Sequence, residues 1–246
     1  MIPPWVISDS IACLPADAAA VTVWRLLSVE QASPAPTTGP MAQGRPSPGK
    51  APTAIVIGVH MGIATPAFPV LQFAGLLAAN TDQLAAARRE LMDCYGPIDA
   101  MSDPLPFTFT SYYDDEMGQG LLRQWVCFST LFDPEQLSRC KHQTNKTEIV
   151  LARQFPHGPR RPINIDPGYL NRFKVILAST KDHSHRVYLG DGIYGEVTLH
   201  WSKSGWTPWP WTYADYQTPV ALNFLTQARE TYLKLLQQRL GPGGRG

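Results

Sequence analysis

The segment between residues 161 and 201 constrains the fold most, because strand-like apolar runs alternate within it with strong turn signals. Ile163–Ile165 predicts one strand, and Lys174–Ala178 fits either another strand or the end of a short helix. A Gly-Asp-Gly sequence, typical of a compact hairpin turn, separates two longer alternating runs, which are Arg186–Leu189 and Ile193–Trp201. This half of the chain therefore predicts an antiparallel sheet.

The part of the chain before this segment alternates strand and helix signals. Val70–Ala78 is apolar throughout and predicts a buried strand, and Thr81 or Asp82 is expected to cap a helix that ends at Gly96-Pro97. Further elements are predicted in chain order: strands at Ile98–Met101 and Leu121–Phe132, a helix from Asp133-Pro134 to about Gln154, and a helix from Pro219 to about Leu240. The expected fold class is α+β, with helices packed on a largely antiparallel sheet related to the ferredoxin-like arrangement.

Composition predicts that only part of the chain forms a packed core. Residues 31–53 are rich in Pro, Ala, Gly, Ser and Thr, so they bury too little apolar surface to offset the entropy of ordering them. We therefore expect residues 1–66 to form a disordered or weakly structured extension, with Met41 as an alternative start of translation. Residues 67–240 are expected to form a single α+β domain, and residues 241–246 a disordered tail.

Charge and hydropathy exclude several classes of protein. The 246 residues contain 21 Lys and Arg against 20 Asp and Glu, which argues against a strongly basic nucleic-acid binder or a polybasic membrane anchor. Residues 54–79 are uncharged over a membrane-spanning length, but Pro66 and Pro69 interrupt them, and a buried strand explains their end better. Because no basic segment precedes an apolar run at the N-terminus, we expect a cytoplasmic protein.

Four sequence motifs resemble a known family. They are GPIDAMSDPLPFTFTSYYDDEMG (96–118), NIDPGYL (164–170), ASTKDHSHRVYLGDGIYGEVTL (178–199) and PWTYADYQTP (210–219). Together they resemble the prokaryotic domain-of-unknown-function family numbered 4416, over about residues 69–240. Some members of that family carry a GTP-binding label, yet this chain contains no G-x-x-x-x-G-K-[ST] phosphate-binding loop. The resemblance therefore implies a prokaryotic origin but no mechanism.

Two histidines separated by one residue suggest a divalent metal as a cofactor. His183 and His185 would lie on one face of an extended segment, where both imidazoles could reach one cation. Glu196, on the partner strand of the expected hairpin, and Asp166 could complete the ligand set. Such a metal would activate water in a hydrolase or phosphotransferase. The alternative is that one histidine packs or hydrogen-bonds in the core and the other is exposed.

Cations and tyrosines in the same segment suggest a pocket for a small phosphorylated or carboxylated ligand. Arginine and lysine neutralise such anions, and tyrosines can form the walls of the pocket. The expected ligand-binding residues are Lys174, Lys181, Arg186, Tyr188, Tyr194 and Asp191. The alternative is a set of salt bridges within the protein, because acidic residues are nearly as numerous there as basic ones.

An acidic sequence lies in the long loop over residues 102–120. Long loops inside domains are often functional, so Glu116 is a candidate general base. Asp166, Glu116 and His183 are accordingly the candidate catalytic residues, which would orient or process the ligand. The alternative is a helix-like turn in which the acidic side chains are solvated and the tyrosines cover the sheet. No nucleophile motif is present, which leaves open whether the protein is an enzyme.

A protein-interaction adaptor is the third class of function. Four tryptophans and two prolines follow the expected hairpin and resemble a docking surface for a protein partner: Trp201, Trp206, Trp209, Trp211, Pro208 and Pro210. Such residues more often form a packed cover over a hairpin.

Overall fold

The structure is a computed structural model and describes residues 64–241. Residues 1–63 of the expected extension and residues 242–246 of the expected tail lie outside this range. The division into an extension, a domain and a tail therefore stays a prediction. All the elements below lie between Ala67 and Gly241.

The first half of the sheet has the ferredoxin-like order β-α-β-β-α-β, as expected. Its elements are β1 (Val70–Ala78), α1 (Thr81–Tyr95), β2 (Ile98–Met101), β4 (Leu122–Phe132), α3 (Leu137–Gln154) and β5 (Ile163–Leu170). In space the strands follow the order β2-β4-β1-β5, and every neighbouring pair is antiparallel. The loop between β2 and β4 holds two short elements, β3 (Leu105–Pro106) and α2 (Asp114–Met117).

The second half extends the same sheet beyond β5. It consists of β6 (Lys174–Ser179), β7 (Val187–Gly190), β8 (Ile193–Ser202), β9 (Gly205–Pro208) and α4 (Pro219–Leu240), with 3₁₀ turns η1 (Pro134–Gln136) and η2 (Ala214–Gln217). The spatial order continues as β5-β6-β8-β7, and β9 pairs with β8. The α+β class and the largely antiparallel sheet are thus confirmed. The β7–β8 hairpin turns at Asp191 and Gly192, both with positive φ angles.

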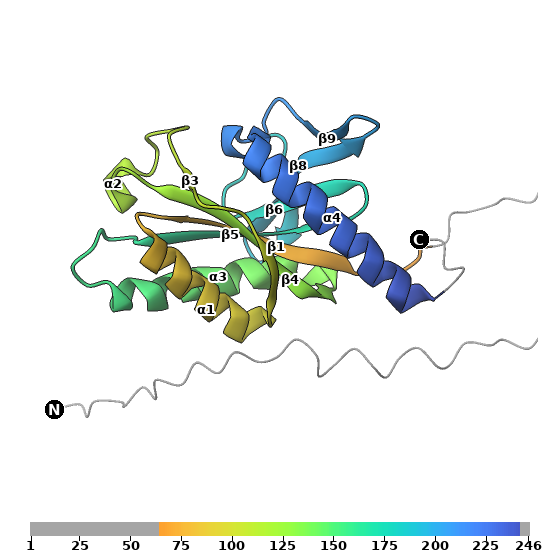
Figure 1. Cartoon of the computed structure of the whole chain (residues 1–246), viewed down its shortest axis with the longest axis horizontal. Helices are drawn as coiled ribbons and strands as arrows, with labels where there is room; N and C mark the ends of the chain where they lie inside the picture. Colours follow the sequence, from red (N-terminus) through yellow and green to blue (C-terminus); the bar gives the residue numbers. More distant parts are fainter. Residues whose placement is uncertain (1–63, 242–246) are drawn as a thin grey trace, which may run out of the picture. The chain divides into compact units, whose positions relative to one another are not determined.

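Helices cover both faces of the sheet (Figure 1). Helices α1 and α3 pack on one face, where they bury Ala74 and Leu76 of β1. Helix α4 packs on the other face, where it buries Leu71 and Phe73 of the same strand. Burial on both faces explains why β1 is apolar throughout. No helix between residues 64 and 241 is long and apolar enough to span a membrane.

Two local expectations were wrong. The cap of α1 is Asn80, whose side chain accepts from Gln83 N at 3.0 Å, in place of Thr81 or Asp82. Strand β5 continues past Ile165 to Leu170 and includes Pro167. The backbone nitrogens of residues 165 and 167 point away from β1, toward the edge that faces β6. Pairing with β6 begins only at residue 168, so no strand hydrogen bond is lost when Pro167 lacks an N–H group.

Candidate functional site

Strands β5 and β6 separate over part of their length, and this opens a polar site in the sheet. Their pairing covers only residues 168–170 of β5, so residues 163–167 have one edge without a strand partner. Side chains of α3 satisfy that edge: Ile165 N donates to Glu148 Oε1 at 2.8 Å, and Lys141 Nζ donates to Ile165 O at 2.9 Å. Charged groups of α3 are therefore drawn into the sheet.

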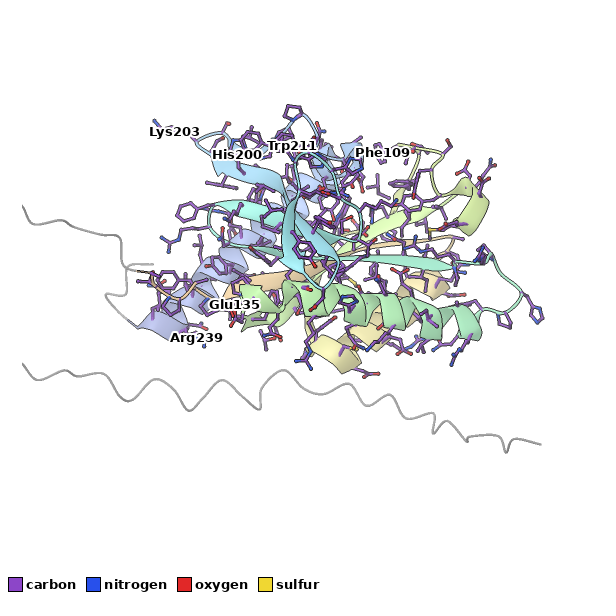
Figure 2. The ribbon with its side chains drawn as sticks, turned by 180° about the vertical axis from the view of Figure 1, so that it is seen from behind. Phe109, Glu135, His200, Lys203, Trp211 and Arg239 are labelled. Atoms are coloured by element: carbon purple, nitrogen blue, oxygen red, sulfur yellow. The ribbon has the colours of Figure 1, made fainter. Side chains whose placement is uncertain are left out.

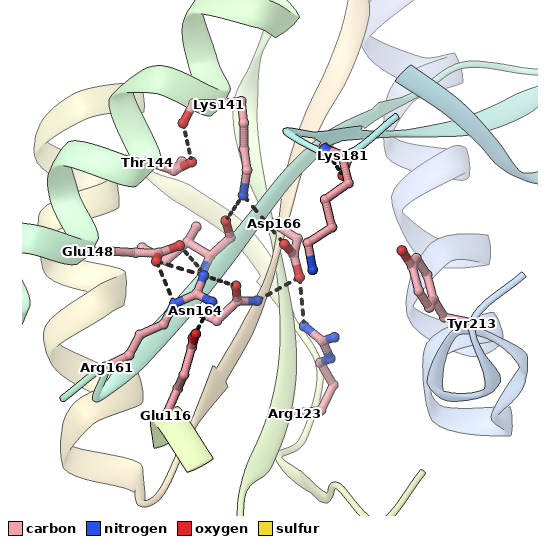
Figure 3. A network of polar contacts seen from close by, with 12 residues as sticks. Glu116, Arg123, Lys141, Thr144, Glu148, Arg161, Asn164, Asp166, Lys181 and Tyr213 are labelled. Atoms are coloured by element: carbon pink, nitrogen blue, oxygen red, sulfur yellow. Dashed lines mark hydrogen bonds and ion pairs between the residues drawn. The ribbon is translucent and has the colours of Figure 1, made fainter. Parts of the chain in front are cut away.

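Asp166 lies at the centre of the resulting network (Figure 3). Its carboxylate accepts from Asn164 Nδ2 at 2.8 Å and lies 3.5 Å from both Arg123 Nη1 and Lys141 Nζ. Burial by itself would raise the pKa of Asp166, but Lys141, Arg123 and neighbouring donors lower it below its ordinary value. The side chain remains 24% exposed, so solvent or a ligand can reach a carboxylate that is charged at neutral pH.

Arg123 anchors the network from β4. Its side chain is 4% exposed, its Nε donates to Asp215 Oδ2 at 2.7 Å, and its Nη1 faces Asp166. The guanidinium also lies over the Phe107 ring, 5.4 Å from the centroid. Because Asp215 belongs to η2 and Asp166 to β5, one arginine joins three separate parts of the chain.

Arg161 forms the outer part of the network. Its guanidinium pairs with Glu148 Oε2 at 2.9 Å and with the more exposed Glu116 Oε2 at 3.5 Å, and it donates to Asn164 Oδ1. Asn164 thereby links Arg161 to Asp166. Glu116, the candidate general base, lies within the short helix α2, and its Oε2 is 3.5 Å from Arg161 Nη1 at the rim of the network.

The loop from Lys181 to Arg186 faces this network from the other side. The donors of Arg186 bind within the protein, to Glu196 Oε2 at 2.8 Å, Ser179 Oγ at 2.9 Å, Lys181 O at 2.8 Å and the Tyr213 hydroxyl at 2.6 Å. Arg186 therefore positions the loop, and its guanidinium is largely occupied. Lys181 differs, because no carboxylate between residues 64 and 241 lies within ion-pair distance of its ammonium.

Lys181 instead lies against an aromatic ring. Its Nζ is 4.2 Å from the ring centroid of Tyr112 and donates to the hydroxyl of that tyrosine. Figure 3 shows the Lys181 side chain extending from the loop toward Asp166 and Arg123. An exposed ammonium that has only a neutral partner remains available to a ligand.

Two tyrosines flank Asp166. Burial raises the pKa of Tyr113 and of Tyr213, and both hydroxyls interact electrostatically with the Asp166 carboxylate. Both side chains are consequently neutral phenols at pH 7. Since the Tyr213 oxygen already accepts from Arg186, its hydroxyl proton is left to donate elsewhere.

The two histidines occupy a turn, which corrects the expectation of an extended segment. Arg186 N donates to His183 O, and the rings of His183 and His185 stack at 5.7 Å. Stacking continues from His185 to Trp211 at 5.3 Å and from Trp211 to Trp209 at 5.3 Å, and the tilted His200 ring lies 4.5 Å from Trp209. Trp211 and His200 lie near each other beside the β8–β9 hairpin (Figure 2). Trp209 and Trp211 thus use ring faces within the protein, while both side chains remain partly exposed.

The four expected metal ligands do not converge. His185 Nε2 lies 3.3 Å from Glu196 Oε2, but that oxygen also accepts from Arg186. Over residues 64–241, no group of three or more His, Cys, Asp or Glu side chains is placed to hold a metal. His183 and Asp166 take part in different contacts, the first in the ring column and the second in the ion network. The turn directs the two imidazoles into a stack, which their spacing in the sequence did not indicate.

Other expected ligand-binding residues lie outside the network. Tyr188 and Tyr194 pack against each other at 5.2 Å in the hairpin, and Asp191 contacts His142 through its carbonyl oxygen. Lys174 lines a separate cavity. Sequence reasoning missed the residues that surround Asp166 from other elements: Arg123, Lys141, Asp215, Tyr113 and Tyr213. The one available signal was Arg123, a charge inside the strand predicted at Leu121–Phe132.

Acidification is expected to weaken the wild-type protein more than Asp166→Asn. The folded-state pKa of Asp166 lies below its unfolded value of about 4, so the carboxylate stabilises the fold above that pH, and this stabilisation is lost as the pH falls through the folded pKa. Urea unfolding between about pH 6 and about pH 3 should show the stability difference between the two proteins shrinking toward acid. Burial also raises the pKa of Glu148, and the Asp166 charge raises it further, so Glu148→Gln in both proteins isolates the contribution of Asp166. A difference that grows on acidification contradicts this role.

Comparison with protein-family models finds a match to the one described as Domain of unknown function (DUF4416), over residues 69–232. The matched range runs from β1 into α4 and includes the whole network around Asp166. No curated protein matches the chain, and no solved structure matches it.

Proposed function

We infer that this chain, which belongs to the family described as Domain of unknown function (DUF4416), binds a small anionic ligand at the Asp166 network. The observation that carries this proposal is Lys181, whose ammonium faces the network without a carboxylate partner in the part of the chain that the structure describes. We also propose a cytoplasmic, prokaryotic setting, as the sequence suggested.

An excess of hydrogen-bond donors next to Asp166 supports an anion. Gly75 is the cross-strand neighbour of Asp166, and its missing side chain leaves three donors facing one point. A Cβ atom built there would lie 2.8 Å from the Tyr216 hydroxyl, 3.2 Å from Arg123 Nη1 and 3.5 Å from Trp125 Nε1. The Tyr216 and Trp125 donors are buried without a hydrogen-bond partner in residues 64–241. Unpaired buried donors favour a ligand that brings acceptors.

Asp166 favours a ligand group that donates a hydrogen bond. Its low pKa keeps it an acceptor at neutral pH, and it would repel an anion unless that anion also offers a donor. We therefore propose a ligand with a phosphate or carboxylate group for Lys181 and a hydroxyl or amino group for Asp166. Tyr113 and Tyr213 provide the walls and two neutral hydroxyls. Small hydroxylated phosphates or carboxylates have this combination.

Thermal unfolding with three probes tests the proposal. Glycerol 3-phosphate should stabilise the protein more than inorganic phosphate does, and glycerol should have no effect, because only the first probe satisfies both Lys181 and Asp166. At about ten times the Kd, the midpoint should rise by about 3–5 °C. Glycerate serves as the carboxylate counterpart.

Substitutions separate the two contacts. Lys181→Ala should weaken phosphate and glycerol 3-phosphate binding about ten-fold or more, since a charge-assisted contact is lost. Asp166→Asn should remove the preference for glycerol 3-phosphate over phosphate. Lys203→Ala, at the exposed turn between β8 and β9 (Figure 2), is the matched control and should bind like the wild type. Equal binding by Lys181→Ala and the wild type would refute the proposal.

A further inference from the structure

A second cavity lies apart from the Asp166 network. It has a volume of about 180 Å³ and is bounded by the residues before β1, the turn between β5 and β6, and the second half of α4. Lys174, which the sequence grouped with Lys181, lines this cavity. The structure thus divides the expected ligand-binding cations between two places.

The described lining of the cavity carries positive charge. Arg172 and Lys174 are among the lining residues, and none of those within residues 64–241 is Asp or Glu. The one lining amide is engaged in the turn, because Asn171 Oδ1 accepts from Phe173 N at 2.8 Å and from Lys174 N at 3.0 Å. The cavity therefore presents donors and favours an anionic group.

A buried tyrosine contributes a further donor. Tyr232 of α4 lines the cavity and is 2% exposed. Burial raises the pKa of Tyr232, so the hydroxyl keeps its proton at neutral pH. A protonated hydroxyl at the cavity wall can donate a hydrogen bond to a ligand oxygen.

The cavity also has apolar lining. Phe68, Phe173 and Leu236 contribute to it, and both phenylalanines are exposed to solvent despite their size. The Arg172 guanidinium lies 5.6 Å from the centroid of the Phe173 ring, so charge and apolar surface adjoin. A ligand that matches both kinds of lining combines an anionic group with a flat apolar group.

We propose that this cavity binds a small aromatic carboxylate, of the size of benzoate, independently of the Asp166 network. Lys174 and Tyr232 contact the carboxylate, and Phe68 and Phe173 contact the ring. The size fits, because a cavity of about 150 Å³ in another protein holds benzene, and this one has about 180 Å³.

Titration calorimetry with three probes tests this site. Benzoate should bind with measurable heat, benzyl alcohol should bind at least ten-fold more weakly because it lacks the charge, and inorganic phosphate should not compete with benzoate. Lys174→Ala should weaken benzoate binding about ten-fold, and Tyr232→Phe several-fold. Lys181→Ala should leave the affinity for benzoate unchanged, which separates this site from the Asp166 network.

Three results would overturn the proposal: no heat with benzoate, equal affinity for benzoate and benzyl alcohol, or unchanged benzoate affinity in both Lys174→Ala and Tyr232→Phe. Circular dichroism of each variant shows that a loss of binding is not a loss of fold. Tyr232→Phe keeps the buried ring, so it tests the hydroxyl alone.

Discussion

Replacing Arg123 with alanine is expected to lower the free energy of unfolding by about 3–5 kcal/mol. Arg123 is the cation bound to Asp215, whose residue is 2% exposed, and its loss leaves a buried carboxylate without a cationic partner in the described chain. The contact of the guanidinium with the Phe107 ring is lost as well. The thermal midpoint should fall by about 10 °C, and urea unfolding at pH 7 measures the change directly.

Further variants make this result specific. Arg239→Ala removes an exposed arginine near the end of α4 (Figure 2) and should change stability by less than about 0.5 kcal/mol. Asp215→Asn combined with Arg123→Met should cost less than the two single changes added together, because neither charge is then left alone. If Arg123→Ala does not fold, Arg123→Lys, which keeps the charge, should fold with a smaller loss. A loss below about 1 kcal/mol for Arg123→Ala contradicts the anchoring role.

Gly168→Ala should destabilise the protein by about 3 kcal/mol, the upper end of the usual cost of overpacking. Gly168 sits where β5 begins to pair with β6. A Cβ atom there would collide with the backbone oxygen of Ile176 and lie 2.8 Å from the Phe73 ring. The oxygen belongs to the strand ladder and the ring to the core, so neither moves without breaking contacts. Equilibrium unfolding in urea reports the loss.

Gly195→Ala is the matched control for this glycine. Gly195 also lies in a strand, but its new Cβ would meet only the end of the Leu189 side chain, at 3.1 Å. Leu189 is 43% exposed and can rotate away, so the change should stay within about 1 kcal/mol. Equal losses in the two variants would show that strand glycines are sensitive here for a reason other than backbone collision.

The order of helices and strands was predictable because its signals are local. The C-terminal helix from Pro219 to Leu240 and the hairpin around Asp191 follow from residues adjacent in the chain, and both are confirmed. The strand predicted at Leu121–Phe132 follows from its alternation and is confirmed as Leu122–Phe132. The longer β5 was missed because Pro167 is a strand signal only when one edge of the strand is free.

The candidate site was predictable only in part. Asp166 and Lys181 were expected from residues 161–201, and both lie at the network. Arg186, from the same segment, instead positions the loop, and Lys174 lines another cavity. Tyr188 and Tyr194 were expected as walls because they are close in sequence to these cations. The tyrosines that flank Asp166 come instead from the loop before α2 and the loop before η2.

The amino-acid sequence by itself determined the succession of elements, the α+β class and the polar character of residues 161–201. Only the tertiary structure decided which charges meet. Arg123 is 92 residues from Asp215 and 43 residues from Asp166, and it reaches both because β1 lies between β4 and β5 while β5 separates from β6. Turn and helix signals act between near neighbours, whereas an ion pair depends on the register of distant strands, which local preferences do not specify.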